Sequence, residues 1–398
     1  MGDEGQRALA EAVARQPDDE TFLSHFTQLE KCYPRAVVRC ALETALLRRK
    51  AAVKFPAWAD VMYFTREGLE MASGAGIAAY RAGRYAGART VVDLACGLGG
   101  DLVALAGVAQ GVTGIDRDDL AVALARANLR AVGRMATVVQ ADVRQWTPSG
   151  GEWVFFDPGR RSGGRRIQHV RDYQPPLSVV DGWLGQVGGL GVKLSPGVAI
   201  DELAAYLPQA ELEFISVAGE LKEAVLWLGG LRHESARRAT LLPEGGDTPI
   251  ATLTGGRADE IELVLSDPQA VLYEPDPAVL RAGLVRHLAR DLGAAMLSDD
   301  IAFLTAAERV ATPWVRAYQI EDWLPFSKKR LEAYLQARGV GRVVVKKRGS
   351  PLDVAQFERS LKLTGDPAVW RTVVLTQVRG RAVMIVCGTE VGDGRGAL

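Results

Sequence analysis

The stretch from Val91 to Ala106, VVDLACGLGGDLVALA, constrains the fold of this chain more than any other. A short apolar run is followed by three closely spaced glycines and then by apolar residues at helical spacing. This order predicts a β-strand, a tight turn and the first turns of a helix. Such a turn lies at the open end of a parallel sheet, where nucleotide-like cofactors bind.

From Thr90 onward, short apolar runs alternate with helical stretches. The runs are TVVDLA, GVTGID, ATVVQAD, EWVFFD, GGLGVKLS and ELEFISV. Near-continuous apolar runs between amphipathic helices are typical of a parallel sheet that helices cover on both faces. The later segments EAVLWLG and PIATLTGG are expected to close the sheet as an antiparallel hairpin. We therefore predict an α/β, Rossmann-like core over residues 88–256.

Two further regions flank this core. Residues 1–87 show helical spacing, and residues 266–398 predict a compact α+β domain. In that domain PDPAVLRAGLVRHLARDLG is expected to be one helix, capped by Asp276, and a second helix is expected to begin at Ser327 and end at Gly339. GRVVVKKRG, TVVLTQV and RAVMIVCG are expected strands.

The composition is that of an ordinary globular protein, with 48% hydrophobic and 24% charged residues and zero formal net charge. The four cysteines are scattered, which predicts neither a zinc site nor a disulfide framework, and we expect no bound metal. The N-terminal residues lack the features of a signal peptide, and no apolar run reaches the length of a membrane span. We expect a cytoplasmic protein without membrane contact; its oligomeric state is left open.

The glycine pattern separates two classes of cofactor. A dinucleotide fingerprint, GxGxxG, would need a third glycine where the chain has Leu102. In addition, Asp93 stands inside the first strand, where a carboxylate would repel a pyrophosphate and attract a cation. This favours S-adenosylmethionine, which carries an ammonium and a sulfonium and no phosphate.

Acidic residues recur at the ends of the next three strands. Asp116 is placed to accept the ribose hydroxyls, Asp142 to bind the adenine amine, and Asp157-Pro158 to lie at the methyl group. The alternative interpretation is that these acids only cap helices after each strand. Their recurrence on four consecutive strands, with Asp93, favours the cofactor interpretation.

The motifs DLACGLGGDLVALA, GIDRDDLAVALARANL, QADV and FFDPGRR together resemble class I S-adenosylmethionine-dependent methyltransferases. They are most similar to the trimethylguanosine-synthase type of RNA guanine methyltransferase, in which CGxGG precedes a polar residue, here Asp101. YEPDPAVLRAGLV, LPFSKKRLEAYL, VVKKRGSPLD and LKLTGD resemble a THUMP-like domain. THUMP domains present tRNA acceptor ends to attached catalytic domains, so the resemblance implies tRNA or rRNA as the partner.

The sequence departs from the family pattern at three positions. Ala95 replaces the usual first glycine of the turn, and we expect its backbone to keep a negative φ. At the fourth strand, amino-methyltransferases carry (D/N)PP followed by an aromatic residue, and here the second proline is Gly159 and the aromatic is Arg160. Asp157 and the Pro158 carbonyl can still hold an exocyclic amine. Lys193, at the end of the fifth run, is interpreted as a surface lysine.

Residues 160–171, RRSGGRRIQHVR, hold five arginines and no acid. This basic run predicts a loop that grips RNA phosphates through Arg160, Arg161, Arg165 and Arg166; the alternative is a solvated surface loop. The segment YFTREGLEMASG resembles the one preceding the core in RNA-cap enzymes, which implies that Tyr63 and Phe64 help to roof the cofactor and the base. Alternatively, both aromatics belong to the core.

The predicted function is an S-adenosylmethionine-dependent methyltransferase acting on RNA, with Asp157 and Pro158 as catalytic residues. The alternatives are a methyltransferase of an anionic small molecule and a non-catalytic RNA-binding protein. The predicted cofactor-binding residues are Asp93, Ala95, Cys96, Gly97, Gly99, Asp101, Asp116, Arg117, Asp142, Val143 and Asp157.

Overall fold

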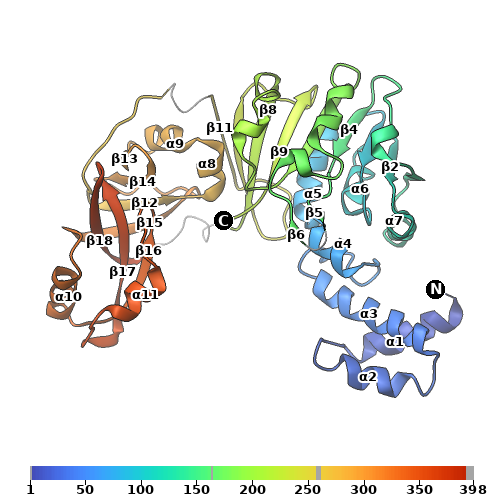
Figure 1. Ribbon diagram of the computed structural model, residues 1–398, viewed down its shortest axis with the longest axis horizontal. Coiled ribbons are helices and arrows are strands. Elements are labelled where there is room, and N and C mark those ends of the chain that lie inside the picture. Colours follow the sequence, from blue (N-terminus) through green and yellow to red (C-terminus); the bar gives the residue numbers. More distant parts are fainter. Residues whose placement is uncertain (1, 163–164, 257–260, 391–398) are drawn as a thin grey trace. The chain divides into compact units, whose positions relative to one another are not determined.

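The computed structural model describes residues 2–162, 165–256 and 261–390 (Figure 1). The chain divides into two compact units. The first holds the described residues up to Ala210 together with Ala224–His233 and Leu242–Pro249. The second holds Glu211–Glu223, Glu234–Leu241 and the described residues from Ile250 onward.

The first unit begins with helices, as predicted. They are α1 (Asp3–Ala14), α2 (Phe22–Leu29), α3 (Arg35–Ala51), α4 (Arg66–Met71) and α5 (Ala75–Ala82). Apolar side chains of α1, α2 and α3 form one buried cluster that includes Leu9, Leu29 and Leu42. A second cluster joins the end of α3 and the following segment to Leu98, a residue of the glycine-rich turn. The helices therefore pack directly against the predicted cofactor turn.

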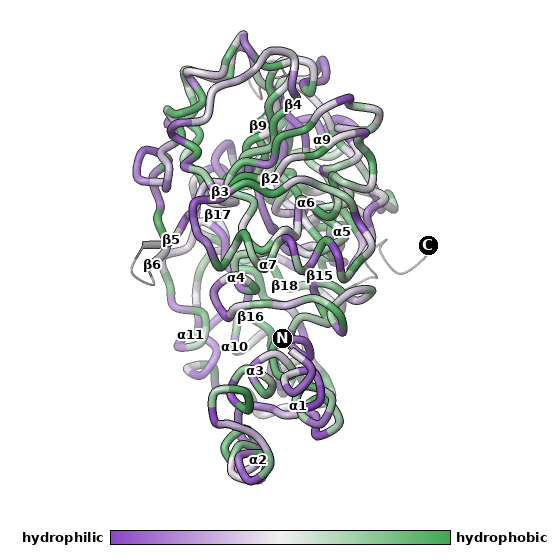
Figure 2. Tube along the Cα trace, turned by 90° about the vertical axis from the view of Figure 1, so that its right-hand side faces the viewer, coloured by the Kyte–Doolittle hydropathy of each residue, from purple (hydrophilic) through white to green (hydrophobic). Residues whose placement is uncertain are grey.

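A nine-stranded sheet forms the core, in the order β11-β10-β8-β9-β7-β4-β1-β2-β3. Its strands are β1 (Val91–Leu94), β2 (Val112–Asp116), β3 (Thr137–Gln140), β4 (Trp153–Phe156), β7 (Gly189–Leu194), β8 (Ala210–Val217), β9 (Glu220–Gly229), β10 (Arg237–Leu242) and β11 (Ala251–Gly255). The six predicted apolar runs are all strands. In Figure 2 the green, hydrophobic stretches follow strands such as β2, β4 and β9, in agreement with their burial.

The pairing of these strands places their ends together. β1 pairs in parallel with β2 and β4, β2 with β3, and β4 with β7, whereas β9 runs antiparallel to β7. Helices α6 (Gly100–Leu105) and α7 (Asp119–Ala131) connect the first parallel strands. The residues that follow β1, β2, β3, β4 and β7 consequently meet at one edge of the sheet. The Rossmann-like mixed sheet is confirmed, but the expected hairpin of EAVLWLG and PIATLTGG is wrong: β9 lies between β8 and β7, and β11 pairs with β10.

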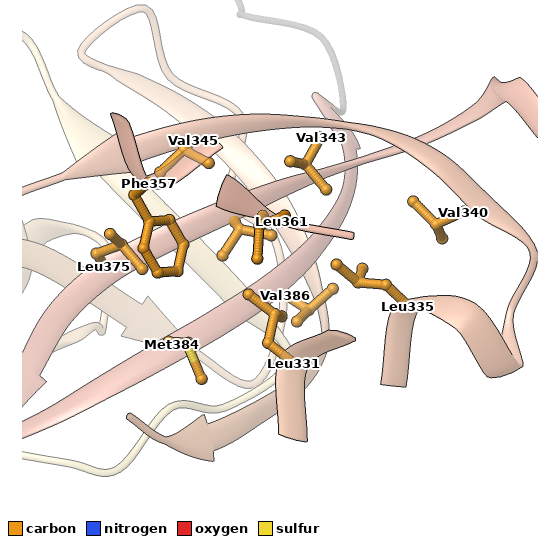
Figure 3. Packing of buried hydrophobic residues seen from close by; sticks show 11 residues of the cluster. Leu331, Leu335, Val340, Val343, Val345, Phe357, Leu361, Leu375, Met384 and Val386 are labelled. Carbon is orange, nitrogen blue, oxygen red and sulfur yellow. The ribbon is translucent and has the colours of Figure 1, made fainter. Parts of the chain in front are cut away.

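The second unit contains a seven-stranded sheet in the order β13-β14-β12-β15-β18-β17-β16. Its elements are β12 (Val271–Pro275), α8 (Pro277–Ala282), α9 (Val285–Asp291), β13 (Ala295–Ser298), β14 (Ile301–Ala306), β15 (Val315–Pro325), α10 (Lys328–Ala337), β16 (Val340–Lys347), α11 (Val354–Ser360), β17 (Asp366–Val378) and β18 (Arg381–Glu390). Figure 3 shows apolar side chains of α10 and α11, such as Leu331 and Phe357, packed against strand residues including Val386. The expected α+β domain is confirmed.

One predicted helix of this domain is wrong in extent. Asp276 caps it as expected, because its side chain accepts a hydrogen bond of 2.9 Å from the Ala278 N–H. The helix then ends at Gly283, whose φ of +74° breaks the helical path, and α9 follows as a separate helix. The helix from Ser327 to Gly339 is confirmed as α10, with Ser327 as its cap. No helix in the described part of the chain is long and apolar enough to cross a membrane.

Candidate cofactor and acceptor site

The turn after β1 is strained where the sequence predicted that it would not be. Ala95 has a φ of +64°, so the expectation of a negative φ is wrong. Gly97 and Gly99 also have positive φ, at +53° and +87°. The N–H groups of Ala95 and Cys96 both donate to the Ile115 carbonyl, at 2.8 and 3.1 Å, which holds the turn against β2. Alanine tolerates this conformation at a cost because its side chain is a single methyl group.

Asp116, at the end of β2, fixes the same turn from the other side. Its Oδ2 accepts a hydrogen bond of 2.9 Å from the Gly97 N–H, and its Oδ1 accepts one of 3.0 Å from the Asp118 N–H. The carboxylate is partly exposed and faces the cavity described next. Both oxygens keep lone pairs that a diol could reach.

A cavity of about 1040 Å³ lies at this edge of the sheet. Its wall combines the ends of the parallel strands with a segment from Thr65 to Ala72. Of the predicted site residues, the following line it: Asp93, Ala95, Cys96, Gly97, Asp101, Asp116, Arg117, Asp142, Val143, Asp157, Pro158 and Arg160. The structure therefore brings together residues spread over more than sixty positions of the sequence.

Asp93 is the most unusual residue of the cavity. It is fully buried, and neither carboxylate oxygen accepts a hydrogen bond from a described residue. Burial, and then the neighbouring Asp101, Asp157 and Asp116 carboxylates, raise the pKa of Asp93 well above its ordinary value. A buried carboxyl group without a partner destabilises the protein unless a ligand supplies one. A cation is the ligand that this group would bind best.

Asp101, in the first turn of α6, has the partner that Asp93 lacks. It forms a hydrogen-bonded ion pair with Arg81, whose side chain is 2% exposed and whose guanidinium lies 5.1 Å from the centroid of the Phe155 ring. Burial raises the pKa of Asp101, but the charges of Arg81 and Lys193 outweigh it and lower the pKa overall. Arg81 was not predicted as a site residue.

Lys193 is not the surface residue that the sequence suggested. It is 2% exposed, inside the fully buried strand β7, and its Nζ lies 2.5 Å from Oδ2 of Asp157. The parallel register explains the contact: Phe156 of β4 pairs with Val192 of β7, so Asp157 and Lys193 leave the two strands side by side. A charged residue within an otherwise apolar run was the signal for this buried pair.

Gly159 explains one departure from the amino-methyltransferase pattern. Its N–H donates to the Gln174 carbonyl at 2.9 Å, and the Gln174 N–H donates back at 3.0 Å. A second proline has no N–H and could not make the first bond. The bridge holds the segment from Tyr173 to Pro176 in the cavity wall, beside the residues that follow β4. The sequence analysis did not identify this segment.

Asp142, after β3, lies at the cavity rim with Arg144. The Arg144 backbone N–H donates to Asp142 Oδ1 at 2.9 Å, and its guanidinium binds the same carboxylate. The hydrogen bonds from Arg144 lower the pKa of Asp142 to about 2. The carboxylate is therefore charged at neutral pH and is shared between Arg144 and any ligand amine.

Cys96 contributes its backbone to the site but no thiolate. Burial, and then the charges of Asp93 and Asp116, raise the pKa of its thiol. Since only a thiolate is an effective nucleophile, Cys96 does not support covalent catalysis in this environment.

The remaining predicted residues lie elsewhere. Phe64 is 8% exposed within the second helical cluster, and neither Phe64 nor Tyr63 is among the residues that line the cavity. Gly99 also lies behind the lining residues, with α7 packed against it. The backbones of Arg161 and Arg166 pair in a short hairpin, β5 (Arg161–Ser162) and β6 (Arg165–Arg166). The side chains of Arg161, Arg165 and Arg166 lie outside the described part of the structure.

Asn128 of α7 ties the helical region to the cofactor turn. Its side chain accepts a bond of 2.7 Å from the Tyr63 N–H and donates to the Tyr63 and Leu98 carbonyls, at 3.0 and 2.9 Å. Tyr63 is therefore linked to the cofactor turn through its backbone and Asn128.

Comparison with known proteins agrees with this geometry. Residues 315–389 match a THUMP domain-like family model, and residues 1–51 match a domain of unknown function. An uncharacterized S-adenosylmethionine-dependent methyltransferase of Mycobacterium tuberculosis H37Rv is 34% identical over 343 residues, which are 85% of this chain and 92% of the relative. The crystal structure of a methyltransferase from Porphyromonas gingivalis W83 has a TM-score of 0.75 at 21% identity, covering 94% of this chain and all of that one.

The fold and the cavity are those of a cofactor-dependent group-transfer enzyme. The chain belongs to the S-adenosylmethionine-dependent methyltransferases. The carboxylates of the site fit this cofactor: Asp101 and Asp157 are paired with Arg81 and Lys193, whereas the buried Asp93 accepts no hydrogen bond from a described residue. S-adenosylmethionine carries an ammonium and a sulfonium and no phosphate, so it can supply the cation that Asp93 lacks.

Proposed function

We propose that this methyltransferase modifies RNA, at an exocyclic amine of a guanine in tRNA or rRNA, and that within its family it is closest in mechanism to the trimethylguanosine-synthase type. The observation that carries the proposal is the basic rim of the cavity. Arg160 follows Asp157-Pro158 after one residue, Gly159, and lines the cavity with Arg117 and Arg144. Arginine binds phosphate oxygens in a bidentate manner, which suits a polyanionic acceptor.

Two of these arginines are available for a ligand. Among the described residues, neither Arg117 nor Arg160 has an ion-pair partner, whereas Arg144 is paired with Asp142. In a chain of zero net charge, unpaired arginines at the mouth of a catalytic cavity are better explained by an anionic partner than by the overall field. The THUMP-like domain supports RNA as that partner.

The chain's own residues would divide the work as follows. Asp93 would pair with the ammonium of the cofactor, Asp116 would accept its ribose hydroxyls, and Asp142 and Val143 would contact its adenine. When bound, the cofactor supplies a methyl group on a sulfonium, a good leaving group. Catalysis then depends mainly on holding the acceptor in line.

Asp157 and Pro158 would hold that acceptor. Oδ1 of Asp157 accepts no hydrogen bond from the described residues, and Pro158 presents its carbonyl at the same cavity wall. These two oxygens can accept the two hydrogens of an amine, which directs the nitrogen lone pair at the methyl group. The segment from Tyr173 to Pro176, which also lines the cavity, would contact the base in place of the missing aromatic.

The test is to identify the missing modification. Nucleosides from RNA of a strain lacking the protein should lack one methylated guanosine in mass spectrometry, and the purified protein should restore it. The Asp157→Ala variant should bind the cofactor with normal affinity, but its rate of methylation of this RNA should be at least about a hundredfold lower. An unchanged nucleoside profile together with an altered metabolite would reject RNA as the substrate.

The four free cysteines fit a reducing compartment, and we propose the cytosol as the location.

A further inference from the structure

Lys193 lies in an environment that a lysine rarely occupies. All six residues of β7 are buried, and this strand lies between β4 and β9 inside the sheet. A buried ammonium is costly unless carboxylates pair with it, and a methionine or leucine would satisfy the packing alone. The charge at position 193 therefore requires a reason beyond the stability of the strand.

The two carboxylates near Lys193 both line the cavity. Asp157 Oδ2 is 2.5 Å from Nζ, and the charge of Lys193 also lowers the pKa of Asp101, after burial and Arg81 have acted on it. An ion pair that served stability alone could lie anywhere in the core. This pair lies at the point where β4 ends and the acceptor is expected.

The two carboxylate oxygens of Asp157 have different surroundings. Oδ2 is held by the lysine, and Oδ1 has no hydrogen bond from a described residue. The side chain of Asp157 is 23% exposed, so without the lysine its carboxylate could rotate freely between two equivalent orientations. With the lysine in place, one oxygen is fixed and the other is left for a ligand.

We propose that Lys193 is a positioning residue for methyl transfer: its Nζ fixes Oδ2 of Asp157 so that Oδ1 accepts a hydrogen bond from the acceptor amine. The proton that the amine loses when it gains the methyl group passes to solvent. This inference rests on the proposed role of Asp157 as the group that holds the acceptor. Lys193 itself acts through Asp157. Its Nζ donates a hydrogen bond to that carboxylate.

The test is a double-mutant cycle on the full chain. Lys193→Met removes the charge and the donor, Lys193→Gln keeps an N–H donor, and Asp157→Asn removes the proposed target of the lysine. Lys222→Met, which breaks an exposed pair with Glu220 on β9, is the matched control. The reaction follows methyl label from the cofactor into the RNA and small-molecule fractions of an extract from a strain lacking the protein, and calorimetry measures cofactor affinity.

We expect Lys193→Met to lower kcat at least about tenfold with cofactor affinity changed less than about threefold, because orientation and not binding is lost. Lys193→Gln should recover part of the rate. In the Asp157→Asn background, Lys193→Met should cost nothing more, since its target is already gone. A wild-type kcat for Lys193→Met, or losses that multiply in the double variant, would overturn the proposal.

The test still gives a clear result if Lys193→Met does not fold or if the substrate is not RNA. If Lys193→Met alone does not fold, the uncharged double variant replaces it: a kcat equal to that of Asp157→Asn supports the proposal, and a lower one overturns it. If the wild type labels only small molecules, RNA is wrong as the substrate, and the same variants are compared on the labelled fraction.

Discussion

Ala95 occupies a backbone conformation that favours glycine. Its φ of +64° places the methyl group close to its own backbone, while the N–H is held by Ile115. A left-handed conformation costs a residue with a Cβ about 1–2 kcal/mol. The turn therefore stores strain at the position where the family usually has glycine.

Replacing Ala95 with glycine should stabilise the protein. The relief of strain exceeds the extra backbone entropy of glycine in the unfolded chain, about 0.4–1 kcal/mol, so a net gain of about 0.5–1 kcal/mol is expected. The thermal midpoint of the cofactor-free protein should rise by about 1–3 °C in a calorimetric scan. A lower midpoint for Ala95→Gly would show that the turn is not strained.

Asp93 should link stability and cofactor binding to pH. Its raised pKa means that folding favours the protonated form. This contribution to stability is fully present below the ordinary pKa near 4 and is lost as the pH rises through the raised pKa. Asp93→Asn has no such loss, so its thermal midpoint should exceed that of the wild type by at least about 2 °C at pH 8. The difference should shrink toward pH 5.

The same variant should lose the cofactor. Removing the charge that would pair with an ammonium in a buried site costs about 3–5 kcal/mol, which is at least about a hundredfold in affinity. Calorimetric titration with S-adenosylmethionine measures it. If Asp93→Asn bound S-adenosylmethionine with wild-type affinity, the ammonium of the cofactor would have to pair with another carboxylate.

At the scale of elements, the bridge between Gly159 and Gln174 joins the residues after β4 to the segment from Tyr173 to Pro176 of the cavity wall. Gly159→Pro restores the family's second proline but deletes the 2.9 Å bond from its N–H. We expect kcat to fall about tenfold, because the loss of this hydrogen bond costs about 0.5–1.5 kcal/mol and the wall is displaced.

Gly159→Ala is the matched control. It keeps the N–H, its φ is not in the left-handed region, and its Cβ would lie 3.2 Å from the Gln174 carbonyl oxygen, a contact that small shifts relieve. Steady-state kinetics with unchanged cofactor affinity should separate the two variants. Equal activities would mean that the bridge does not shape the acceptor site.

Much of this architecture could be predicted because the parallel strands are continuous apolar runs. The strands β10 and β12 to β15 were not predicted from the sequence. The break between α8 and α9 at Gly283 was also missed. The helical spacing of apolar residues continues across this glycine, and that spacing does not reveal a single residue with a left-handed backbone. Cavity residues at strand ends were predictable from their order along the chain.

The pairings of those residues were not predictable. Lys193 meets Asp157 only through the register between β4 and β7, and Arg81 reaches Asp101 from a helix that precedes the sheet. Periodicity reports which face a residue occupies and not which charge lies across from it. Phe64 illustrates the converse, because an aromatic near a motif is as suitable for a core as for a ligand.

At the scale of the whole molecule, RNA binding should depend on salt through the cavity rim. If Arg117 and Arg160 each neutralise a phosphate, the double alanine variant should flatten the log–log slope of affinity against salt by about 1.4, or about 0.7 per contact on single strands. Fluorescence anisotropy with small bacterial RNA at several salt concentrations measures the slope.

Arg89 provides the control for this prediction. It is exposed and precedes β1, so it lies at the opposite end of that strand from the cavity. Arg89→Ala should leave the slope unchanged. Coinciding slopes for the rim variant and the wild type would remove the phosphate contacts from the proposal.

The three hydrogen bonds of Asn128 set a limit on modularity. They join the backbone at Tyr63 and Leu98 to the side-chain amide of Asn128. The region before the sheet and the turn after β1 are therefore both held by this one side chain. A graft that exchanged the first 87 residues between relatives would have to return the backbone at position 63 to within hydrogen-bond reach of Asn128. Protein engineers should therefore treat the helical region and the catalytic core as one exchangeable part.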